Sequence, residues 1–299
     1  MRSTAWTMIW SWLLVLSLLG GCKRTSLPGV ASSIVHPFLE GVIAAEAGTL
    51  FRGVFSPDGA EFYFFRKVSE DGEDYRVFRI QREGAAWSAP SLLTLADGDA
   101  SNLYPAISPD GKLIVFSSYR PVDEASHNAN LWAARRGGTG WGEPFQLDHV
   151  STIDNYDAGP WFGPDGDLRF TSTSPDWATT WQRMASPSGG SYGPWREDTS
   201  WADFDIPEAT HHFWTGVINQ TRTLAVLEVS ERKADGSLAG SDLWLSRWGN
   251  GGWSPPVPLG PEVNTEGTEN FATFVPGGST LVFVRNFSIF LSVRVSELR

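Results

Sequence analysis

The sequence Ser108-Pro109-Asp110-Gly111 lies between two apolar segments, Tyr104-Pro105-Ala106-Ile107 and Leu113-Ile114-Val115-Phe116. Proline sets φ for the second position of a type I turn, aspartate hydrogen-bonds the nearby backbone, and glycine accepts a positive φ. Two apolar segments joined by such a turn predict a β-hairpin.

This turn recurs along the chain. Copies start at Ser56 and Gly163, and Val275-Pro276-Gly277-Gly278 keeps the form without the aspartate. The last interval is twice the others, so we expect a degenerate copy near Asn219-Gln220, where asparagine tolerates left-handed φ. Five strand-built copies at a period of about 55 residues indicate a β-propeller or a β-solenoid.

Two further strands follow each turn. The third carries related sequences, such as Asn130-Leu131-Trp132 and Asp242-Leu243-Trp244. The fourth opens with Trp and Pro, as in Trp141-Gly142-Glu143-Pro144 and Trp253-Ser254-Pro255-Pro256. No segment after Cys22 has a 3.6-residue apolar period, so we predict an all-β fold with essentially no helix.

The strand positions at which the repeats begin and end predict how the propeller closes into a ring. Pro37 occupies a fourth-strand position before any other strand has appeared, whereas the last repeat ends after its third strand. An N-terminal strand that completes the last sheet leaves no long unpaired edge. We therefore expect five four-stranded blades closed by an N-terminal strand, with an insertion at residues 201–207 before the fourth blade.

The Ser-Pro-Asp-Gly turn, the Asp-Leu-Trp strand and the Gly-Trp-Ser-x-Pro strand resemble the WD40-like PD40 repeats of TolB-type β-propellers. The resemblance covers nearly all of residues 37–295. It implies binding of a protein or ligand rather than turnover. TolB-type rings resemble six-bladed propellers, which keeps six blades as the alternative.

The N-terminal sequence is typical of a cleaved signal peptide. Residues 1–21 combine Arg2 with an apolar segment, and Leu19-Gly20-Gly21-Cys22 resembles a bacterial lipobox, in which the cysteine is acylated. We expect a signal peptide at 1–21, a tether at 22–34 and the propeller at 35–299. By the sorting rule of the lipoproteins that this sequence resembles, Lys23 implies the outer membrane, with the protein facing the periplasm. An ordinary cleaved secretory signal is the alternative.

Charge limits the partners. The net charge is −11 and no cluster of Lys and Arg is present, which argues against a nucleic-acid partner. An acidic surface also argues against direct binding to an anionic membrane leaflet. We therefore expect membrane contact only through the lipid attached to Cys22.

The segments just before the first strands should lie at the mouth of the central tunnel. They carry the polar residues that we predict as ligand-binding: Glu46, Asp99, Asn102, Asp157, Glu208, His211, Glu269 and Asn270. Crowded carboxylates repel unless a cation or hydrogen-bond donors neutralise them. This ring predicts a site for a polar ligand or for Ca²⁺; the alternative is a solvated acidic rim. His211 and His212 should point to opposite faces of a regular strand.

Two classes of function follow. We favour a monomeric, non-catalytic binding propeller of the cell envelope, with an envelope protein, a polar small ligand or a glycan as partner. The rival is a glycoside hydrolase, in which a pair from Asp99, Asp157, Glu208 and Glu269 acts while Trp161 and Trp214 stack on sugar. We find none of the catalytic motifs that would favour the rival.

Overall fold

The computed structural model describes residues 34–43, 49–70, 74–95, 100–122, 128–138, 140–152, 154–177 and 179–298. Residues 34–299 form one compact unit. The signal peptide, Cys22 and most of the tether lie outside the described residues. None of the described helices is long and apolar enough to cross a membrane.

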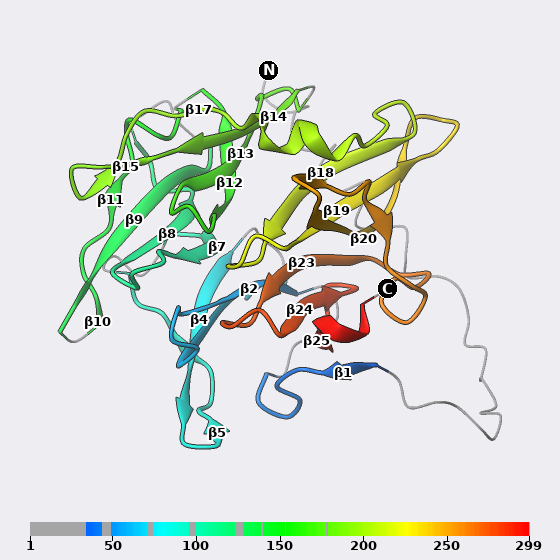
Figure 1. The fold of residues 1–299 in the computed structure, drawn as a ribbon. Helices are drawn as coiled ribbons and strands as arrows, with labels where there is room; N and C mark the ends of the chain where they lie inside the picture. The colour runs from blue at the N-terminus through cyan, green and yellow to red at the C-terminus, as the bar shows by residue number, and fades with distance from the viewer. Residues whose placement is uncertain are drawn as a thin grey trace. The chain divides into compact units, whose positions relative to one another are not determined.

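The unit is a five-bladed β-propeller, as the repeat predicts (Figure 1). Blade I contains β2 (Leu50–Phe55), β3 (Glu61–Lys67), β4 (Tyr75–Glu83), β5 (Ala86–Trp87) and β6 (Ser91–Leu92). Blade II contains β7 (Asn102–Ile107), β8 (Leu113–Ser118), β9 (Asn130–Gly137), β10 (Gly140–Trp141) and β11 (Phe145–Gln146). Blade III contains β12 (Tyr156–Phe162), β13 (Leu168–Thr173), β14 (Thr180–Ala185) and β17 (Arg196–Glu197), with the small hairpin of β15 (Pro187–Ser188) and β16 (Ser191–Tyr192).

Blade IV contains β18 (His211–Ile218), β19 (Leu224–Arg232), β20 (Leu238–Gly249), β21 (Gly252–Trp253) and β22 (Val257–Pro258). Blade V contains β23 (Glu269–Phe274), β24 (Thr280–Arg285), β25 (Ile289–Arg294) and β1 (Val35–Pro37). The first strands β2, β7, β12, β18 and β23 lie innermost, around the centre of the ring (Figure 1).

The N-terminal strand closes the ring. In Figure 1 the blue strand β1 lies beside the red strand β25, and His36 pairs with Ser292 in an antiparallel register. The backbone N–H of Phe38 extends the pairing by donating to Phe290 O at 2.8 Å. Strand β1 therefore covers the edge that the last repeat leaves open, which confirms the predicted closure.

Each joint between neighbouring blades holds its own apolar core. Phe64 of blade I packs with Val282 of blade V, and Val115 of blade II packs with Phe170 of blade III. Similar clusters fill the other three joints. The core is thus divided among the joints, as expected when twisted sheets are packed face to face around an axis.

Two pairs of neighbouring turns pack against each other in the same way. A Cβ on Gly111 would lie 3.8 Å from Pro57, and one on Gly59 would lie 3.7 Å from Pro276. The proline of one turn therefore rests on the glycine of the next, including at the joint between blades V and I. Both glycines also have φ near +70°, which favours a residue without a side chain.

The predicted insertion forms a short 3₁₀ helix, η2 (Thr199–Phe204). It buries Trp201 and Phe204 in the joint between blades III and IV. A second 3₁₀ turn, η3 (Val295–Glu297), follows β25. No α-helix occurs among the described residues.

The fourth turn differs from the prediction in its conformation. The left-handed residue is Arg222, with φ of 54°, rather than Asn219. Asn219 instead replaces the first serine of the other turns, since its Oδ1 accepts from Thr223 N at 2.8 Å and Leu224 N at 3.0 Å. Asn219 Oδ1 accepts from Leu224 N as Ser108 Oγ accepts from Leu113 N. The left-handed residue keeps the fourth position of the turn, where blade II has Gly111.

Candidate ligand site at the centre of the ring

Every inner strand carries an irregularity at the same level. The register shifts between Leu50 and Gly53, Leu103 and Ala106, Ala158 and Trp161, Phe213 and Thr215, and Asn270 and Thr273. An extra residue in a strand bends it and re-aims its side chains. These bulges present side chains to the centre of the ring.

Two of the bulge residues have an uncommon backbone conformation. Tyr104 and Phe271 have φ of 50° and 54°, and Gly159 holds the matching position in blade III with φ of 63°. Left-handed φ costs a side-chain-bearing residue about 1–2 kcal/mol. Strain of this kind is concentrated at functional sites, which makes this level of the tunnel a candidate.

The bulges bring aromatic side chains from four blades to this level. We call Phe51, Tyr104, Trp214 and Phe271 the mouth aromatics. The Phe271 ring lies 6.2 Å from Phe51 and 6.1 Å from Tyr104, while Trp214 contacts His212 at 4.3 Å. The Trp214 side chain is 41% exposed and donates from Nε1 to Ser230 Oγ at 2.9 Å. The other three are half-buried.

A charged pair lies beside the mouth aromatics. Arg52, from the bulge of β2, is 6% exposed and donates from Nη1 to Gly159 O of blade III at 3.1 Å. Its side chain therefore reaches across the ring to a non-adjacent blade. Glu228 of β19 is 8% exposed and its Oε2 accepts from Phe271 N at 3.0 Å. The bulge takes the Phe271 N–H out of the hydrogen-bond ladder between β23 and β24. The Glu228 carboxylate accepts this N–H instead.

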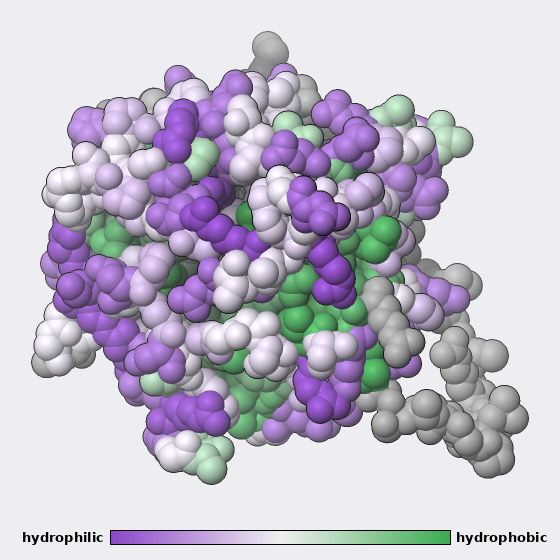
Figure 2. Space-filling model, viewed as in Figure 1, coloured by the Kyte–Doolittle hydropathy of each residue, from purple (hydrophilic) through white to green (hydrophobic). Residues whose placement is uncertain are grey.

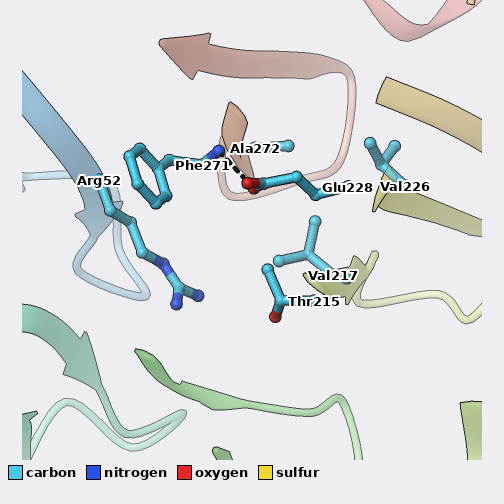
Figure 3. Close-up of a pocket in the computed structure, with 8 residues that line it drawn as sticks. Arg52, Thr215, Val217, Val226, Glu228, Phe271 and Ala272 are labelled. Atoms are coloured by element: carbon cyan, nitrogen blue, oxygen red, sulfur yellow. Dashed lines mark hydrogen bonds between the residues drawn. The ribbon is translucent and has the colours of Figure 1, made fainter. Parts of the chain in front are cut away.

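Arg52 and Glu228 line one small cavity without forming an ion pair with each other (Figure 3). Thr215, Val217 and Phe271 complete much of its wall. The cavity volume is about 10 Å³, enough for about one water molecule. A ligand larger than water must therefore bind above it, against the mouth aromatics, or open it.

Burial changes the acidity of both groups. It raises the pKa of Glu228 to about 7, against the lowering effect of the Phe271 N–H and of Arg52. Burial also lowers the pKa of Arg52 to about 10. Near neutral pH, Glu228 can therefore be present as either the acid or the carboxylate, whereas Arg52 remains charged.

Two of the predicted carboxylates are fully buried and already hydrogen-bonded within the protein. Asp157 Oδ2 accepts from Ser151 Oγ at 2.8 Å and from Thr152 N at 2.5 Å. Glu269 accepts from Thr265 Oγ1 and from Arg285 Nε, each at 2.7 Å. Their ligand-binding role stays a prediction, and a ligand would have to compete with these donors.

The predicted amides lie at the start of inner strands. Asn102 Oδ1 accepts from Arg120 Nη1 at 2.6 Å, and its Nδ2 donates to Ala100 O at 2.9 Å. Asn270 is also buried, but its Oδ1 has no hydrogen-bond partner among the described residues. Asn270 directly precedes Phe271, one of the mouth aromatics. Its Oδ1 can therefore accept a hydrogen bond from a ligand.

The remaining predicted residues of blade IV are more open. Glu208 is exposed, and its carbonyl oxygen accepts from Arg232 Nε at 3.0 Å. The His211 ring packs on Trp244 at 5.0 Å, whereas His212 packs on Trp214. The two histidines thus have different neighbours, as expected for alternating side chains. Burial and Arg232 lower the pKa of His212.

Glu46 and Asp99 lie outside the described residues, so their placement stays a prediction. Among the residues that the structure does describe, no three His, Cys, Asp or Glu side chains gather in a way that could hold a metal ion. Trp161, suggested as a sugar platform, is buried at 5.7 Å from Trp201 and serves as core. Trp214 is open enough to bind a ligand.

Sequence reasoning suggested Trp214 as a sugar platform, but it did not single out Arg52, Glu228 or the other three mouth aromatics. One signal was available: Phe51, Tyr104, Trp214 and Phe271 each precede their turn by four or five residues. A second was Glu228, a charged residue within the apolar segment of β19. The bulges themselves depend on packing at the axis and have no local sequence signature.

Comparison with solved structures finds propellers of low sequence identity. A protein described as TolB from Agrobacterium tumefaciens is 16% identical over 85% of this chain and 77% of its own, with a TM-score of 0.46. A protein of unknown function from Dyadobacter fermentans is 14% identical over 84% and 79%, with a TM-score of 0.47. A gluconolactonase from Xanthomonas campestris is 14% identical over 82% and 72%, with a TM-score of 0.46. At these values the likeness carries no information on activity. No family model and no curated protein sequence matches the chain.

Proposed function

We propose that this chain is a non-catalytic binding propeller of the cell envelope that takes a glycan or similar polar ligand at the mouth of its central tunnel. The observation that carries the proposal is the set of mouth aromatics, presented by bulges of four inner strands beside Arg52 and Glu228. Ligand sites typically combine aromatic walls with a few convergent polar groups. The C–H faces of sugar rings stack on aromatic rings, while their hydroxyls pair with such polar groups.

Blade III carries a further exposed aromatic pair. Trp177 is 53% exposed and its ring lies 4.8 Å from that of Tyr156, at the end of the blade where β12 begins. Gln182 of β14 donates to the carbonyl of Trp214 at 3.0 Å, which ties blades III and IV together there. An extended ligand such as a polysaccharide could contact both Trp177 and Trp214.

Binding of a panel of soluble plant and bacterial polysaccharides, measured by affinity electrophoresis and calorimetry, tests this proposal. Trp214→Ala should weaken binding about tenfold or more, since a stacked aromatic contact contributes about 0.5–1.5 kcal/mol beyond its buried area. Trp248→Ala is the matched control, because Trp248 is 48% exposed but lies at the outer end of β20. Equal losses in both variants, or no binding across the panel, would contradict the proposal. Hydrolysis of a bound glycan would support the rival enzyme.

The envelope location is a separate part of the proposal and depends on acylation of Cys22. It is supported by the sequence Leu19-Gly20-Gly21-Cys22. A Cys22→Ser variant should leave the membrane fraction after a high-salt wash, whereas the wild type should stay. Retention of the variant would mean that another feature anchors the protein.

A further inference from the structure

A second cavity lies at the joint between blades V and I, near the turns and away from the tunnel mouth. Its volume is about 420 Å³, within the range of small-molecule sites. Phe38, Phe55, Trp87 and Pro276 supply apolar walls, and Arg82 is the cation among its lining residues. Figure 2 shows apolar surface in the lower centre of the view, between the positions that β5 and β1 have in Figure 1.

The equivalent joint between blades I and II is filled by a polar network. Arg136 of β9 packs over the Trp141 ring at 5.0 Å, and its Nη2 donates to Glu61 Oε1 at 2.9 Å while Nη1 bonds Oε2. Tyr63 OH donates to Glu61 Oε2 at 2.8 Å and accepts from Trp141 Nε1 at 3.2 Å. A carboxylate and a phenol from blade I therefore complete the arginine–tryptophan pair of blade II.

The repeat places Arg82 where Arg136 stands. Arg82 N donates to Ala60 O and Arg136 N donates to Lys112 O, both at 2.8 Å. Arg82 pairs across the hairpin with Trp87 as Arg136 pairs with Trp141, and its guanidinium lies 5.6 Å from the Trp87 ring. Blade I thus presents the same cation and the same indole to blade V.

Blade V lacks the complementary side chains. Val275 N donates to Thr280 O as Ser56 N donates to Glu61 O, so Thr280 holds the position of Glu61. Two residues further, Val282 holds the position of Tyr63. The loss of a carboxyl group and a phenol ring explains both the cavity and the absence of any described carboxylate within ion-pairing distance of Arg82. Asp58 lines the cavity, but its Oδ1 accepts from Ser56 Oγ at 2.6 Å and Ala60 N at 3.0 Å.

We propose that this cavity binds a small carboxylic acid with a planar apolar body. Its carboxylate pairs with Arg82 as Glu61 pairs with Arg136, and its apolar body fills the space between Phe38 and Trp87 that Tyr63 fills in the other joint. Planar, bidentate carboxylate recognition is the geometry that a guanidinium favours. This site is independent of the proposed glycan site.

Calorimetric titration with phenylacetate and indole-3-acetate tests the proposal, with phenylacetamide as the neutral analogue. The carboxylates should bind, the amide should bind at least tenfold more weakly, and Arg82→Gln should weaken carboxylate binding at least tenfold. Arg222→Gln removes the same charge from an exposed turn of blade IV and should leave affinity unchanged. Equal affinities for acid and amide, equal affinities for wild type and Arg82→Gln, or no binding of either acid would overturn the proposal.

A restored repeat gives a second test that does not depend on the choice of ligand. Thr280→Glu supplies the missing carboxylate, so it should abolish binding of the acids and raise the melting temperature by a few degrees. In an Arg82→Gln background the same change should give no such rise. A rise that persists without Arg82 would mean that the new carboxylate pairs elsewhere, for example with its cross-strand neighbour Arg294, and would contradict the repeat argument.

Discussion

At the scale of single residues, Arg222 stands where the four other turns have glycine. Its φ of 54° is left-handed, and its ion pair with Asp165, at 4.0 Å on the surface, adds little. Arg222→Gly should therefore raise the free energy of unfolding by about 0.5–1 kcal/mol, because relief of the backbone exceeds the entropy that glycine loses. Urea denaturation measures this change.

Gly111→Ala is the matched control for that variant. Gly111 has φ of 70°, and an added Cβ would meet Pro57 only at an ordinary contact distance of 3.8 Å. The substitution therefore isolates the backbone cost, and it should destabilise by about 1 kcal/mol. Destabilisation by both variants would contradict the assignment of strain to Arg222.

Glu228 should make stability depend on pH. Burial raises its pKa from 4.5 to about 7, so the folded state holds a proton that the unfolded state releases between these values. The stability that this proton contributes is present below pH 4.5 and is lost as the pH rises through 7. Glu228→Gln should therefore be more stable than wild type at pH 8, by at most about 3 kcal/mol, with the difference vanishing near pH 4.

Melting temperatures of both proteins from pH 4 to pH 8 measure this effect. Asp157, whose pKa is also raised by burial, contributes a similar slope to both proteins, so the difference isolates Glu228. A constant difference across the range would show that Glu228 does not titrate in the folded protein.

At the scale of elements, η2 is the part of the fold that differs most from the repeat. Trp201 fills the joint between blades III and IV and lies 5.2 Å from Phe213. A Cβ on Gly216 would lie 2.7 Å from the Trp201 ring, so the inner strand β18 needs glycine there. The insertion thus packs the Trp201 indole directly against Gly216, in place of ordinary side-chain contacts between two blades.

Truncation of this indole tests the role of the insertion. Trp201→Ala should cost about 3–5 kcal/mol of stability, and Gly216→Ala should destabilise through steric overlap with the ring. In the double variant the new methyl group enters the space that the indole leaves, so its loss should be smaller than the sum of the two single losses. Additive losses in denaturation experiments would show that the two residues do not share a contact.

At the scale of the whole molecule, the number and order of blades could be predicted from the sequence because each turn and each Trp-Pro strand is a local signal. Pro37 in a fourth-strand position was sufficient to predict the closure. Arg52 and Glu228 could not be placed in one site in this way, since the cavity that they share is lined by residues of blades I, IV and V. The burial of Asp157 and Glu269 likewise depends on loop donors such as Thr152 and Thr265, which no spacing reveals.

Closure by β1 predicts how truncation affects the ring. Deletion of residues 1–33 keeps the pairing of β1 with β25 and should leave the melting temperature almost unchanged. Deletion on through residue 43 removes the pairing of Val35 with Val293 and of Phe38 with Phe290 O. It also removes the Phe38 ring, which contacts Phe55 at 5.7 Å and Phe62 at 5.4 Å in blade I.

The longer deletion should therefore lower the melting temperature strongly or cause association, because it exposes the edge of β25 and opens the joint between blades V and I. Phe38→Ala in the full chain separates the two effects. It keeps the backbone pairing, so it should cost about 3–5 kcal/mol or less without exposing a strand edge, and the protein should remain monomeric in size-exclusion chromatography. Equal melting temperatures for the two deletions would exclude β1 as the closing strand.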